Sequence, residues 1–379
     1  MKVLHTSDWH LGKTLMEHSL HEDQQHALDQ LTAMVSAEPH DLLVVSGDIF
    51  DRGIPPENAV RLLGSWFADV RSADAGLPIV MIAGNHDHGV RLAWARGLLA
   101  HANVHIVGEP DAVGEAIRIT TRSGENAEVW ALPFLWAGSF PDPGEKGRTQ
   151  VGAIEVALAR IHARQTPGHT QILLAHCFAQ NGTASDSERT LLGQATRVDP
   201  TIFAAFDYVA LGHLHRPQKV APNAHYSGSL AKYSFSEVAD RKGVNSVTVR
   251  AGALPVVTQK RLTPFRDMQL LTGELNELLT DPRHDDAVNT YVSVTLTQPV
   301  MLGNPMAALR KRFPFALHLD NPMAPVAEGS VPPHARNGKE NDVGEDFLLF
   351  HKHLYGRDAE PDIVAAFQTL RRADEKAAE

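Results

Sequence analysis

Cysteine is almost absent from this chain of 379 residues, which holds only Cys177. A single cysteine excludes a disulfide within the chain and is typical of proteins from a reducing compartment. Long apolar runs are also absent, so we expect no segment that spans a bilayer. The first residues, Met1–His5, enter a strand pattern at once. We therefore expect no signal peptide and predict a cytoplasmic protein.

Positive charge is scarce as well. The chain has 35 Lys and Arg against 45 Asp and Glu, which gives a formal net charge of −10. Phosphate contacts need clustered Lys and Arg, so this balance argues against strong, self-sufficient binding of nucleic acid. An enzyme that acts on nucleic acid stays possible, because bound divalent cations invert the local sign of charge and a partner subunit can supply basic surface.

Histidine, by contrast, is abundant, with 21 residues. The chain is longer than one compact core usually holds, so we predict a large domain and smaller pieces. Apolar strands alternate with amphipathic helices at the start of the chain, which predicts a mostly parallel, layered α/β arrangement. The expected elements there are strands at 2–7, 41–46, 78–83 and 104–107 and helices at 22–37, 57–70 and 90–100.

Further strands are expected in the rest of the large domain, at 116–121, 128–132, 171–175 and 207–211, with a helix at 152–163. Residues 244–261 are predicted to form two antiparallel strands that close a second sheet. Two sheets with helices outside them would form a two-sheet α/β sandwich. This large domain is expected to cover residues 1–265.

Near Pro264 the pattern changes. Residues 266–320 are predicted to form a small α/β module, with strands at 290–297 and 315–319 and a helix at 304–312. Residues 321–345 are rich in Pro, Gly, Asn and charge, which predicts a linker. The tail, 346–379, contains two short amphipathic helices. A helix pair beyond a linker is expected to dock on a partner, although it can also fold back onto its own domain.

Polar side chains follow five of the predicted strands at the point where each strand ends. They are Asp8 and His10, Asp48, Asn85, His176, and His213 and His215. In layered α/β folds, chemistry is found at the carboxyl ends of strands. In an extended chain residues i and i+2 point the same way, so Asp8 and His10 can reach one ion, and His213 and His215 repeat that spacing.

These seven residues are too many ligands for one tetrahedral ion. Two ions about 3.5–4 Å apart, bridged by Asp48, would clamp and polarise a phosphate. Mixed nitrogen and oxygen ligands suit manganese, iron or zinc better than magnesium. A single His or Asp at a strand end is more often a turn residue or helix cap, and we interpret His5 and Cys177, beside the ligands, as packing residues. The complete set favours a metal site.

The motifs that carry these residues resemble the signature of the calcineurin-like metallophosphoesterases. In chain order they are Asp8-x-His10, Gly47-Asp48-x-x-Asp51, Gly84-Asn85-His86-Asp87, His176 and Gly212-His213-x-His215. Their surroundings, above all SDWHLGK (7–13) and ALGHLHRPQ (210–218), are similar to the SbcD family of bacterial nuclease subunits. The resemblance covers about residues 1–265. Beyond them only the layout matches, and Leu230 stands where the family has proline.

The resemblance implies roles for the site residues. One ion would be held by Asp8, His10, Asp48 and His215, and the other by Asp48, Asn85, His176 and His213. His86 would assist the scissile phosphate without binding an ion, by stabilising the transition state or protonating the leaving oxygen. Asp51 and Asp87 would orient histidines or form turns. Lys13 and Arg52 would contact DNA phosphates or remain solvated surface charges.

The resemblance also implies an activity and partners. The chain would be a Mn²⁺-dependent nuclease, with 3′–5′ exonuclease activity on double-stranded DNA and endonuclease activity on single strands and hairpins. It would act in DNA repair, recombination and replication, near the nucleoid, as a homodimer with an SbcC-like coiled-coil ATPase. The small module would be a DNA-capping domain. The alternative is a metallophosphoesterase that acts on small phosphodiesters or phosphoproteins, while the full ligand set argues against a scaffold without metals.

Overall fold

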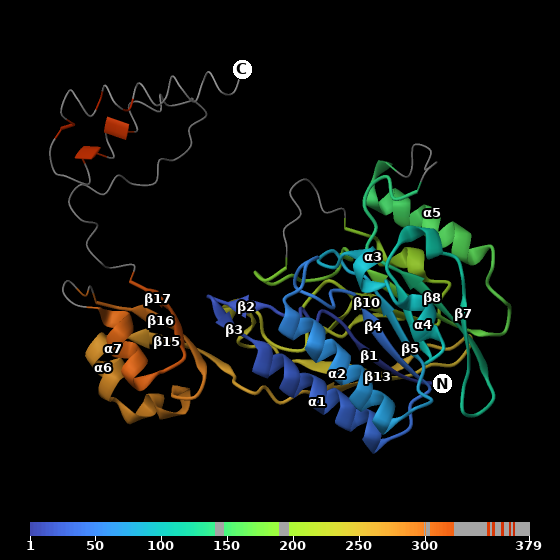
Figure 1. Cartoon of the computed structure of the whole chain (residues 1–379), viewed down its shortest axis with the longest axis horizontal. Coiled ribbons are helices and arrows are strands. Elements are labelled where there is room, and N and C mark those ends of the chain that lie inside the picture. The colour runs from blue at the N-terminus through green and yellow to red at the C-terminus, as the bar shows by residue number, and fades with distance from the viewer. Residues whose placement is uncertain are drawn as a thin grey trace.

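The computed structural model describes residues 1–140, 148–188, 197–298, 300 and 304–321, with a few positions beyond residue 346. Within them, two six-stranded sheets form the large body and a three-stranded sheet forms a separate module (Figure 1). The predicted two-sheet α/β architecture is confirmed. None of the helices in the described ranges has the length and apolar content that crossing a bilayer requires.

The first sheet has parallel strands at its centre. Its order is β14 (Val256–Arg261), β13 (Gly243–Thr248), β1 (Lys2–Thr6), β4 (Leu42–Ser46), β5 (Ile79–Ile82) and β6 (Val104–Val107). The hairpin β13–β14 joins this sheet through β1 and does not close the second sheet, so that prediction is wrong. The strand β13 pairs with β1 because both of its faces are buried there. Val244 packs in the core beneath the helices, and Val247 packs in the core between the sheets.

The second sheet repeats this plan. Its order is β11 (Gln218–Lys219), β12 (Ala224–Tyr226), β10 (Tyr208–Gly212), β9 (Thr170–His176), β8 (Asn126–Leu132) and β7 (Ile117–Thr120). Strands β8, β9, β10 and β12 run parallel, and β7 and β11 lie antiparallel at the edges. Both β11 and β12 escaped prediction, because two or three residues are too few for a periodic pattern.

An apolar core between the two sheets holds them face to face. It includes Val3, Leu42, Val44, Val80 and Ile82 from the first sheet and Val129, Ile172, Leu174 and Ala210 from the second. Alternate residues of β4, Leu43 and Val45, point instead toward the helices. Helices α1 (His21–Ala37) and α2 (Glu57–Ala73) pack on the first sheet, and α5 (Gln150–His162) packs on the second. Burial on both faces explains the continuous apolar runs of the strands.

The helix expected at 90–100 is two short helices, α3 (Gly89–Leu92) and α4 (Arg96–Ala100). The chain leaves the helical conformation at Ala93 and Ala95, and the amide of Arg96 bonds to the carbonyl of Ala93 at 3.0 Å. Ala93 is buried, whereas Trp94 is 81% exposed. Residues 90–100 therefore lack a continuous apolar face, and the turn at 93–95 ends α3.

The module consists of three parallel strands with two helices. They are β15 (Met268–Gly273), α6 (Leu275–Thr280), β16 (Tyr291–Leu296), α7 (Pro305–Arg312) and β17 (Ala316–Asp320). The predicted strand, helix and strand from residue 290 onward are present, whereas β15 and α6 were missed. The predicted linker (321–345, apart from its first residue) and the predicted tail helices (346–379, apart from isolated positions) lie outside the described residues.

The module contacts the body through its first two strands. Met268 and Tyr291 share a small apolar cluster with Leu15, Leu20 and Tyr233 of the body. Leu15 belongs to a short hairpin, β2 (Thr14–Leu15) and β3 (His18–Ser19), that directly follows the first ligand loop. The module therefore lies next to the loops at the carboxyl ends of the strands.

Candidate metal centre

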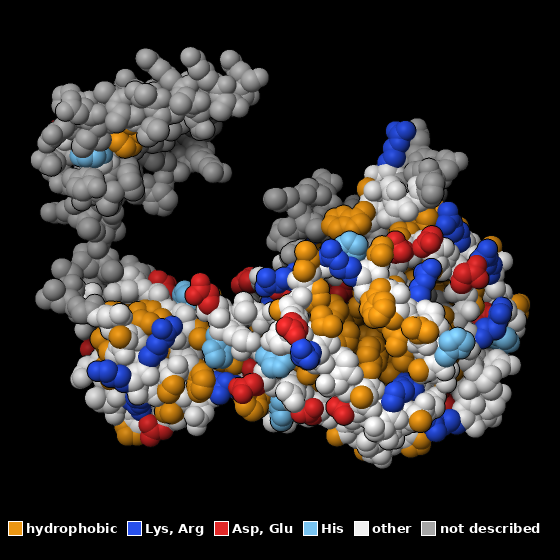
Figure 2. Space-filling model, viewed as in Figure 1, with side chains coloured by type: hydrophobic (Ala, Val, Ile, Leu, Met, Phe, Trp, Pro, Cys, Tyr) orange, Lys and Arg blue, Asp and Glu red, His pale blue; other side chains and the backbone are white. Residues whose placement is uncertain are grey.

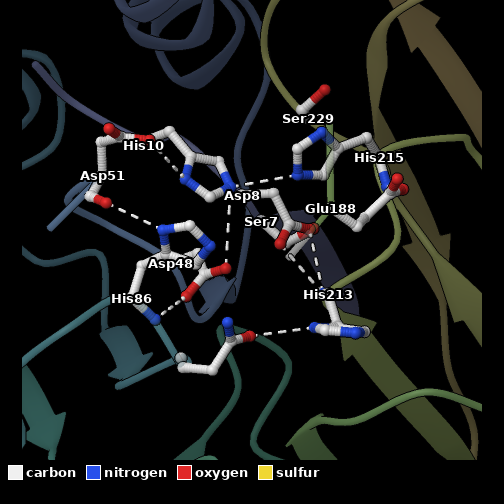
Figure 3. Close-up of polar contacts among 12 residues, drawn as sticks. Ser7, Asp8, His10, Asp48, Asp51, His86, Glu188, His213, His215 and Ser229 are labelled. Atoms are coloured by element: carbon white, nitrogen blue, oxygen red, sulfur yellow. Dashed lines mark hydrogen bonds and ion pairs between the residues drawn. The ribbon is translucent and has the colours of Figure 1, made fainter. Parts of the chain in front are cut away.

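All seven predicted ligands come together where the carboxyl ends of the two sheets meet. Figure 3 shows Asp8, His10, Asp48, His213 and His215 among them. The seven ligands follow β1, β4 and β5 of the first sheet and end or follow β9 and β10 of the second. Six of them are buried, namely Asp8, His10, Asp48, His176, His213 and His215. Parallel strands deliver their ends to one edge, which explains why residues so far apart in the chain converge.

Within the seven predicted ligands, two groups of atoms are compact enough to hold an ion, and His10 forms a third such group with Asp51 and His86. Asp8, His10 and His215 offer atoms within 4.8 Å of one another, and so do Asp8, Asp48 and His176. Oδ2 of Asp48 lies 3.6 Å from Nε2 of His10 and 3.4 Å from Nε2 of His176. The Asp48 carboxylate is thus in reach of both groups, as a bridging ligand must be.

The amide of Asn85 completes the second side of the centre. Its Oδ1 atom lies 3.0 Å from Nε2 of His176 and 2.9 Å from Nδ1 of His213. On the opposite side, Nε2 of His10 and Nε2 of His215 face each other at 3.0 Å. Imidazole nitrogens and carboxylate and amide oxygens therefore turn their lone pairs inward, which is the donor set that Mn²⁺, Fe²⁺ and Zn²⁺ accept.

The backbone reaches this arrangement by unusual turns. Asp8, His10, Asp48 and His213 have φ angles of 53°, 45°, 50° and 108°. Such positive values are uncommon for residues with a side chain and cluster at functional sites. The expected extended geometry is wrong for Asp8 and His10, since β1 already ends at Thr6. Left-handed turns, and not strand alternation, aim the two side chains.

Glycines allow the loops to approach one another closely. A Cβ atom on Gly47 would clash with the His176 ring, and one on Gly84 would clash with Asp48. A Cβ on Gly212 would clash with the carbonyl of Ser46, which belongs to the other sheet. The glycines before Asp48, Asn85 and His213 are therefore required for close contact between the loops.

Burial and mutual charge shift the ionisation of the ligands. Burial raises the pKa of Asp8 to about 7, with a further contribution from the charge of Asp48. Burial alone would raise the pKa of Asp48 as well, but the imidazoles of His176 and His10 hold that pKa well below the usual value. A cation between the two carboxylates would relieve the repulsion between them. The residues present therefore fit a pair of divalent ions.

The two histidines of the second group are shifted in opposite directions. Burial disfavours the charged form of His176, yet the carboxylates of Asp48 and Asp8 raise its pKa to about 9. Burial and the neighbouring His176 lower the pKa of His213 to about 3. Neutral imidazole is the form that binds a metal, so His213 is ready to do so and His176 needs a cation to displace its proton.

His86 lies beside the ligands and is held by two contacts. Its amide donates to Oδ1 of Asp48 at 2.9 Å, and Nδ1 of the ring bonds to the carbonyl of Asp51 at 2.8 Å. The ring packs edge-on against His10, with 4.6 Å between the ring centroids. Because the Asp51 carbonyl accepts the Nδ1 proton, the neutral ring carries its lone pair on Nε2.

Asp51 and Lys13 form an ion pair at the edge of the centre. Oδ1 of Asp51 lies 3.4 Å from Nδ1 of His10 and 2.9 Å from Nζ of Lys13. Asp51 therefore contacts a histidine, which favours the first of the two roles left open for it. Lys13 is only 15% exposed, so its interpretation as a solvated surface charge is wrong. Arg52 is exposed.

Asp87 stabilises turns of the backbone, the other role left open for Asp51 and Asp87. Its carboxylate accepts hydrogen bonds from the amides of Ile49, Phe50 and Gly84, at 2.9–3.0 Å. It ties the loop after β4 to the loop after β5 and orients no histidine through these contacts. Burial raises the pKa of Asp87 to about 6.

The two residues interpreted as packing residues are buried, as expected. Nδ1 of His5 lies 2.7 Å from the hydroxyl of Tyr208, and burial lowers the pKa of His5 to about 3. Cys177 belongs to the core of the second sheet, and burial raises the pKa of its thiol to about 12.

Sequence reasoning missed the residues that surround His215 and Asp8. His215 contacts Ser187, Glu188, Glu237 and Lys242. Ser187, Glu188 and Lys242 lie outside helices and strands, and Glu237 ends a 3-10 helix of three residues, so no periodic pattern indicated them. Ser7 donates to Oδ2 of Asp8 at 2.5 Å and lies 2.9 Å from Ser227. Ser227 lies in the stretch YSGSL (226–230), which was the available signal.

Two family models match the chain. Residues 1–217, more than half of it, match the model described as calcineurin-like phosphoesterase. Residues 264–346 match a model named SbcD_C and described as the type 5 capsule protein repressor C-terminal domain.

Two solved structures are also similar. A dimetal phosphatase from Danio rerio has 10% sequence identity and a TM-score of 0.43, with 68% of this chain and 98% of that chain covered. A putative 5′-nucleotidase from Staphylococcus aureus, in complex with α-ketoglutarate, has 11% identity and a TM-score of 0.42, with 70% and 55% covered.

Proposed function

We propose that this chain, which belongs to the calcineurin-like phosphoesterase family and is a metal-dependent phosphoester hydrolase, acts on DNA. It is then the nuclease subunit of an SbcCD-type complex, which degrades double strands 3′ to 5′ and cuts single strands and hairpins. The observation that carries this proposal is the match of residues 264–346 to the SbcD_C model. The HLGK and GHLHRPQ stretches around the ligands support it.

The position of the module also supports a polymeric substrate. Tyr233, in the apolar cluster shared with the module, has its ring 5.4 Å from His10 and 5.6 Å from His215. A single residue, Tyr233, thus contacts both the module and two ligands of the centre. A long substrate that reaches the ions would meet the module as well, whereas a small phosphoester would not need it.

The proposed chemistry assigns a role to each group. Asp8, His10, Asp48 and His215 would hold one ion, and Asp48, Asn85, His176 and His213 the other. Two divalent ions supply the positive charge that polarises a phosphate and activates water. His86, held by Asp48 and Asp51, presents Nε2 for proton transfer to the leaving oxygen when its ring is protonated. The mixed donor set suits Mn²⁺, Fe²⁺ or Zn²⁺, and the resemblance to the SbcD family favours Mn²⁺ among them.

A homodimer is proposed from the surface of the body. Val90, Trp94 and Leu98, on or next to α3 and α4, are 53%, 81% and 74% exposed. Figure 2 shows hydrophobic side chains gathered on the face that carries these helices. Large exposed apolar patches mark protein interfaces. Changing Trp94 and Leu98 to Glu is expected to convert a dimer into a monomer in analytical ultracentrifugation, and an unchanged mass would place the interface elsewhere.

An SbcC-like coiled-coil ATPase is the proposed partner of the C-terminal tail. Deletion of residues 346–379 is expected to leave basal nuclease activity unchanged and to abolish co-purification with the ATPase. Retained binding would contradict the docking role of the tail.

Cleavage assays test the substrate. We expect linear duplex and hairpin DNA to be cut with Mn²⁺ and to stay intact with EDTA. A net charge of −10 favours the alternative, a phosphoesterase for small phosphodiesters or phosphoproteins. Good turnover of a small phosphodiester without any metal-dependent cleavage of DNA would establish that alternative.

A further inference from the structure

A buried ion pair holds His215 from two sides. Glu237 is fully buried, and its Oε1 atom lies 3.4 Å from Nδ1 of His215. Its Oε2 atom lies 2.7 Å from Nζ of Lys242, which donates to the carbonyl of His215 at 2.8 Å. The same pair thus fixes both the ring and the backbone of one candidate ligand. Ser187 bonds to both Glu237 and His215 Nδ1, the latter at 2.6 Å.

The first turn of α1 holds His10 in a similar way. Gln24 is buried, and its Nε2 atom donates to the carbonyl of His10 at 2.6 Å. Its Oε1 atom accepts the amide of Gly12 at 3.1 Å, so the loop is fixed at two points. The preceding residue, Asp23, accepts a hydrogen bond of 2.7 Å from the hydroxyl of Tyr291 in the module. One helical turn therefore joins the module to the His10 loop.

The segment that carries Glu237 is also tied to the start of the module. Lys232 bonds to Oδ1 of Asp267 and to the carbonyl of Val238, both at 2.6 Å. Glu237 accepts the amide of Tyr233 at 3.1 Å. Two tethers, one through Asp23 and one through Lys232, thus connect the module to His10 and His215.

The region between these tethers is not filled. A cavity of about 190 Å³ lies there, lined among others by Asp23, Lys232, Lys242 and Tyr291. Protein interiors are otherwise close-packed. The module is therefore not packed solidly against the body here, and the two tethers are among the contacts that span this region.

The other half of the centre has no such connection in the described contacts. Nδ1 of His176 bonds to the carbonyl of Ser46 at 2.8 Å, and the amide of His213 bonds to Oδ1 of Asp8 at 2.9 Å. Asn85 bonds to these same two histidines. All of these partners belong to the loops of the two large sheets.

We propose that Glu237 and Gln24 are positioning residues for His215 and His10, and that they couple the affinity for this one ion to the seating of the module. The inference rests on the proposed two-ion site and does not depend on DNA as the substrate. It makes the two ions unequal, because only the ion of His10 and His215 responds to the module.

Titration of the full, metal-free chain with Mn²⁺ tests the proposal. Electron paramagnetic resonance counts the free ion, and we expect two binding steps for the unchanged protein. Glu237→Gln is expected to weaken one step by about 10–100-fold, the usual effect of losing a partner behind a metal ligand. The matched control is Glu128→Gln, a fully buried carboxylate on β8 that bonds to Thr166 and Gln171. It should leave both steps unchanged.

A second variant separates positioning from folding. Glu237→Gln leaves the buried charge of Lys242 with only the more distant carboxylate of Asp240, 3.6 Å from its Nζ, which destabilises the fold. The double variant Glu237→Gln/Lys242→Met removes that charge, and it is expected to recover the melting temperature of the metal-free protein but not the lost binding step. Recovery of both would overturn the positioning role, and so would equal weakening of both steps.

The module itself is tested by Tyr291→Phe, which removes a single hydroxyl group. We expect the same step to weaken by up to about fivefold, the factor that corresponds to one ordinary hydrogen bond. An unchanged titration would refute the coupling to the module. If the unchanged protein binds no Mn²⁺, the proposed two-ion site fails. If it binds two ions and all variants match it, only the further inference fails.

Discussion

The two large sheets contribute different chemistry to the centre. The first sheet supplies all oxygen ligands of the candidate set, Asp8, Asp48 and Asn85, together with His10. The second sheet supplies only imidazoles, from His176, His213 and His215. Each proposed ion takes ligands from both sheets, so neither sheet holds a complete site. The centre is an interface, and the distance between the sheets determines its geometry.

That distance changes along the strands. Packed sheets lie about 10 Å apart because apolar side chains fill the space between them. At the carboxyl ends the backbones of the two sheets approach much more closely, since a Cβ atom on Gly212 would clash with the carbonyl oxygen of Ser46. The glycines at these ends, Gly47 and Gly212, have no side chain to keep the loops apart. The apolar core sets the spacing of the sheets, and the glycines let the loops approach one another at the edge.

The largest effect is expected for Asp48→Ala. Asp48 is the first-sheet ligand within reach of imidazoles from both sheets. Its loss should remove both ions and reduce cleavage to the level measured with EDTA, because a shared carboxylate serves two sites. The matched comparison is His213→Ala on the second sheet, which should remove one ion. Metal analysis of the purified proteins counts the ions, and more metal in Asp48→Ala than in His213→Ala would contradict the bridging role.

The next largest effect is expected for Gly212→Ala, which removes no ligand. The added Cβ would clash with the carbonyl of Ser46 and push the two sheets apart at their ligand edge. Both Mn²⁺ steps should weaken, and the free energy of unfolding should fall by about 1–3 kcal/mol, as is usual for overpacking.

The control for this change is Gly64→Ala in α2, where a Cβ meets no atom within 4 Å. It should leave both binding steps unchanged and raise the unfolding free energy slightly, since alanine favours a helix. Unaltered Mn²⁺ binding in Gly212→Ala would show that the ligands tolerate a wider separation of the sheets.

The buried strands of both sheets and the ligands at their ends can be predicted from the sequence. The apolar runs of β1, β4, β5, β9 and β10 predict buried strands, and the ligand types follow directly after them. Parallel strands then bring the ligands to one edge without further information. The glycine before the ligand at Gly47, Gly84 and Gly212 is visible too, although the clash that it avoids needs the coordinates.

Other features depend on tertiary contacts and stay hidden in the sequence. The choice of β1 as the partner of β13 follows from packing on two faces at once. The left-handed turns at Asp8 and His10 are imposed by hydrogen bonds from their amides to the loop after β4. Glu237 reaches His215 from a 3-10 helix of three residues (Phe235–Glu237), 22 residues away in the chain. Short strands and irregular segments carry no period, so pattern analysis does not find them.

A smaller effect on the ions is expected for His86→Ala. His86 follows β5 of the first sheet, but its ring bonds to the Asp51 carbonyl. Both ions should remain, while cleavage should fall by about 10²–10⁴-fold through loss of proton transfer. Metal analysis and cleavage rates measure the two quantities separately. Loss of an ion would instead make His86 a ligand, in the group that it forms with His10 and Asp51.

The smallest effect on the centre is expected for Tyr208→Phe, which cuts a contact between the sheets away from the ligand edge. The Tyr208 hydroxyl on β10 lies 2.7 Å from Nδ1 of His5 on β1, and both residues are fully buried. Removing it leaves a buried polar atom with one partner fewer, so urea unfolding of the metal-free protein should show a loss of about 1–3 kcal/mol. Both Mn²⁺ steps should stay unchanged, because the core and the glycines still set the spacing at the edge. A loss of affinity as large as that of Gly212→Ala would mean that the spacing of the two sheets is controlled along their whole length.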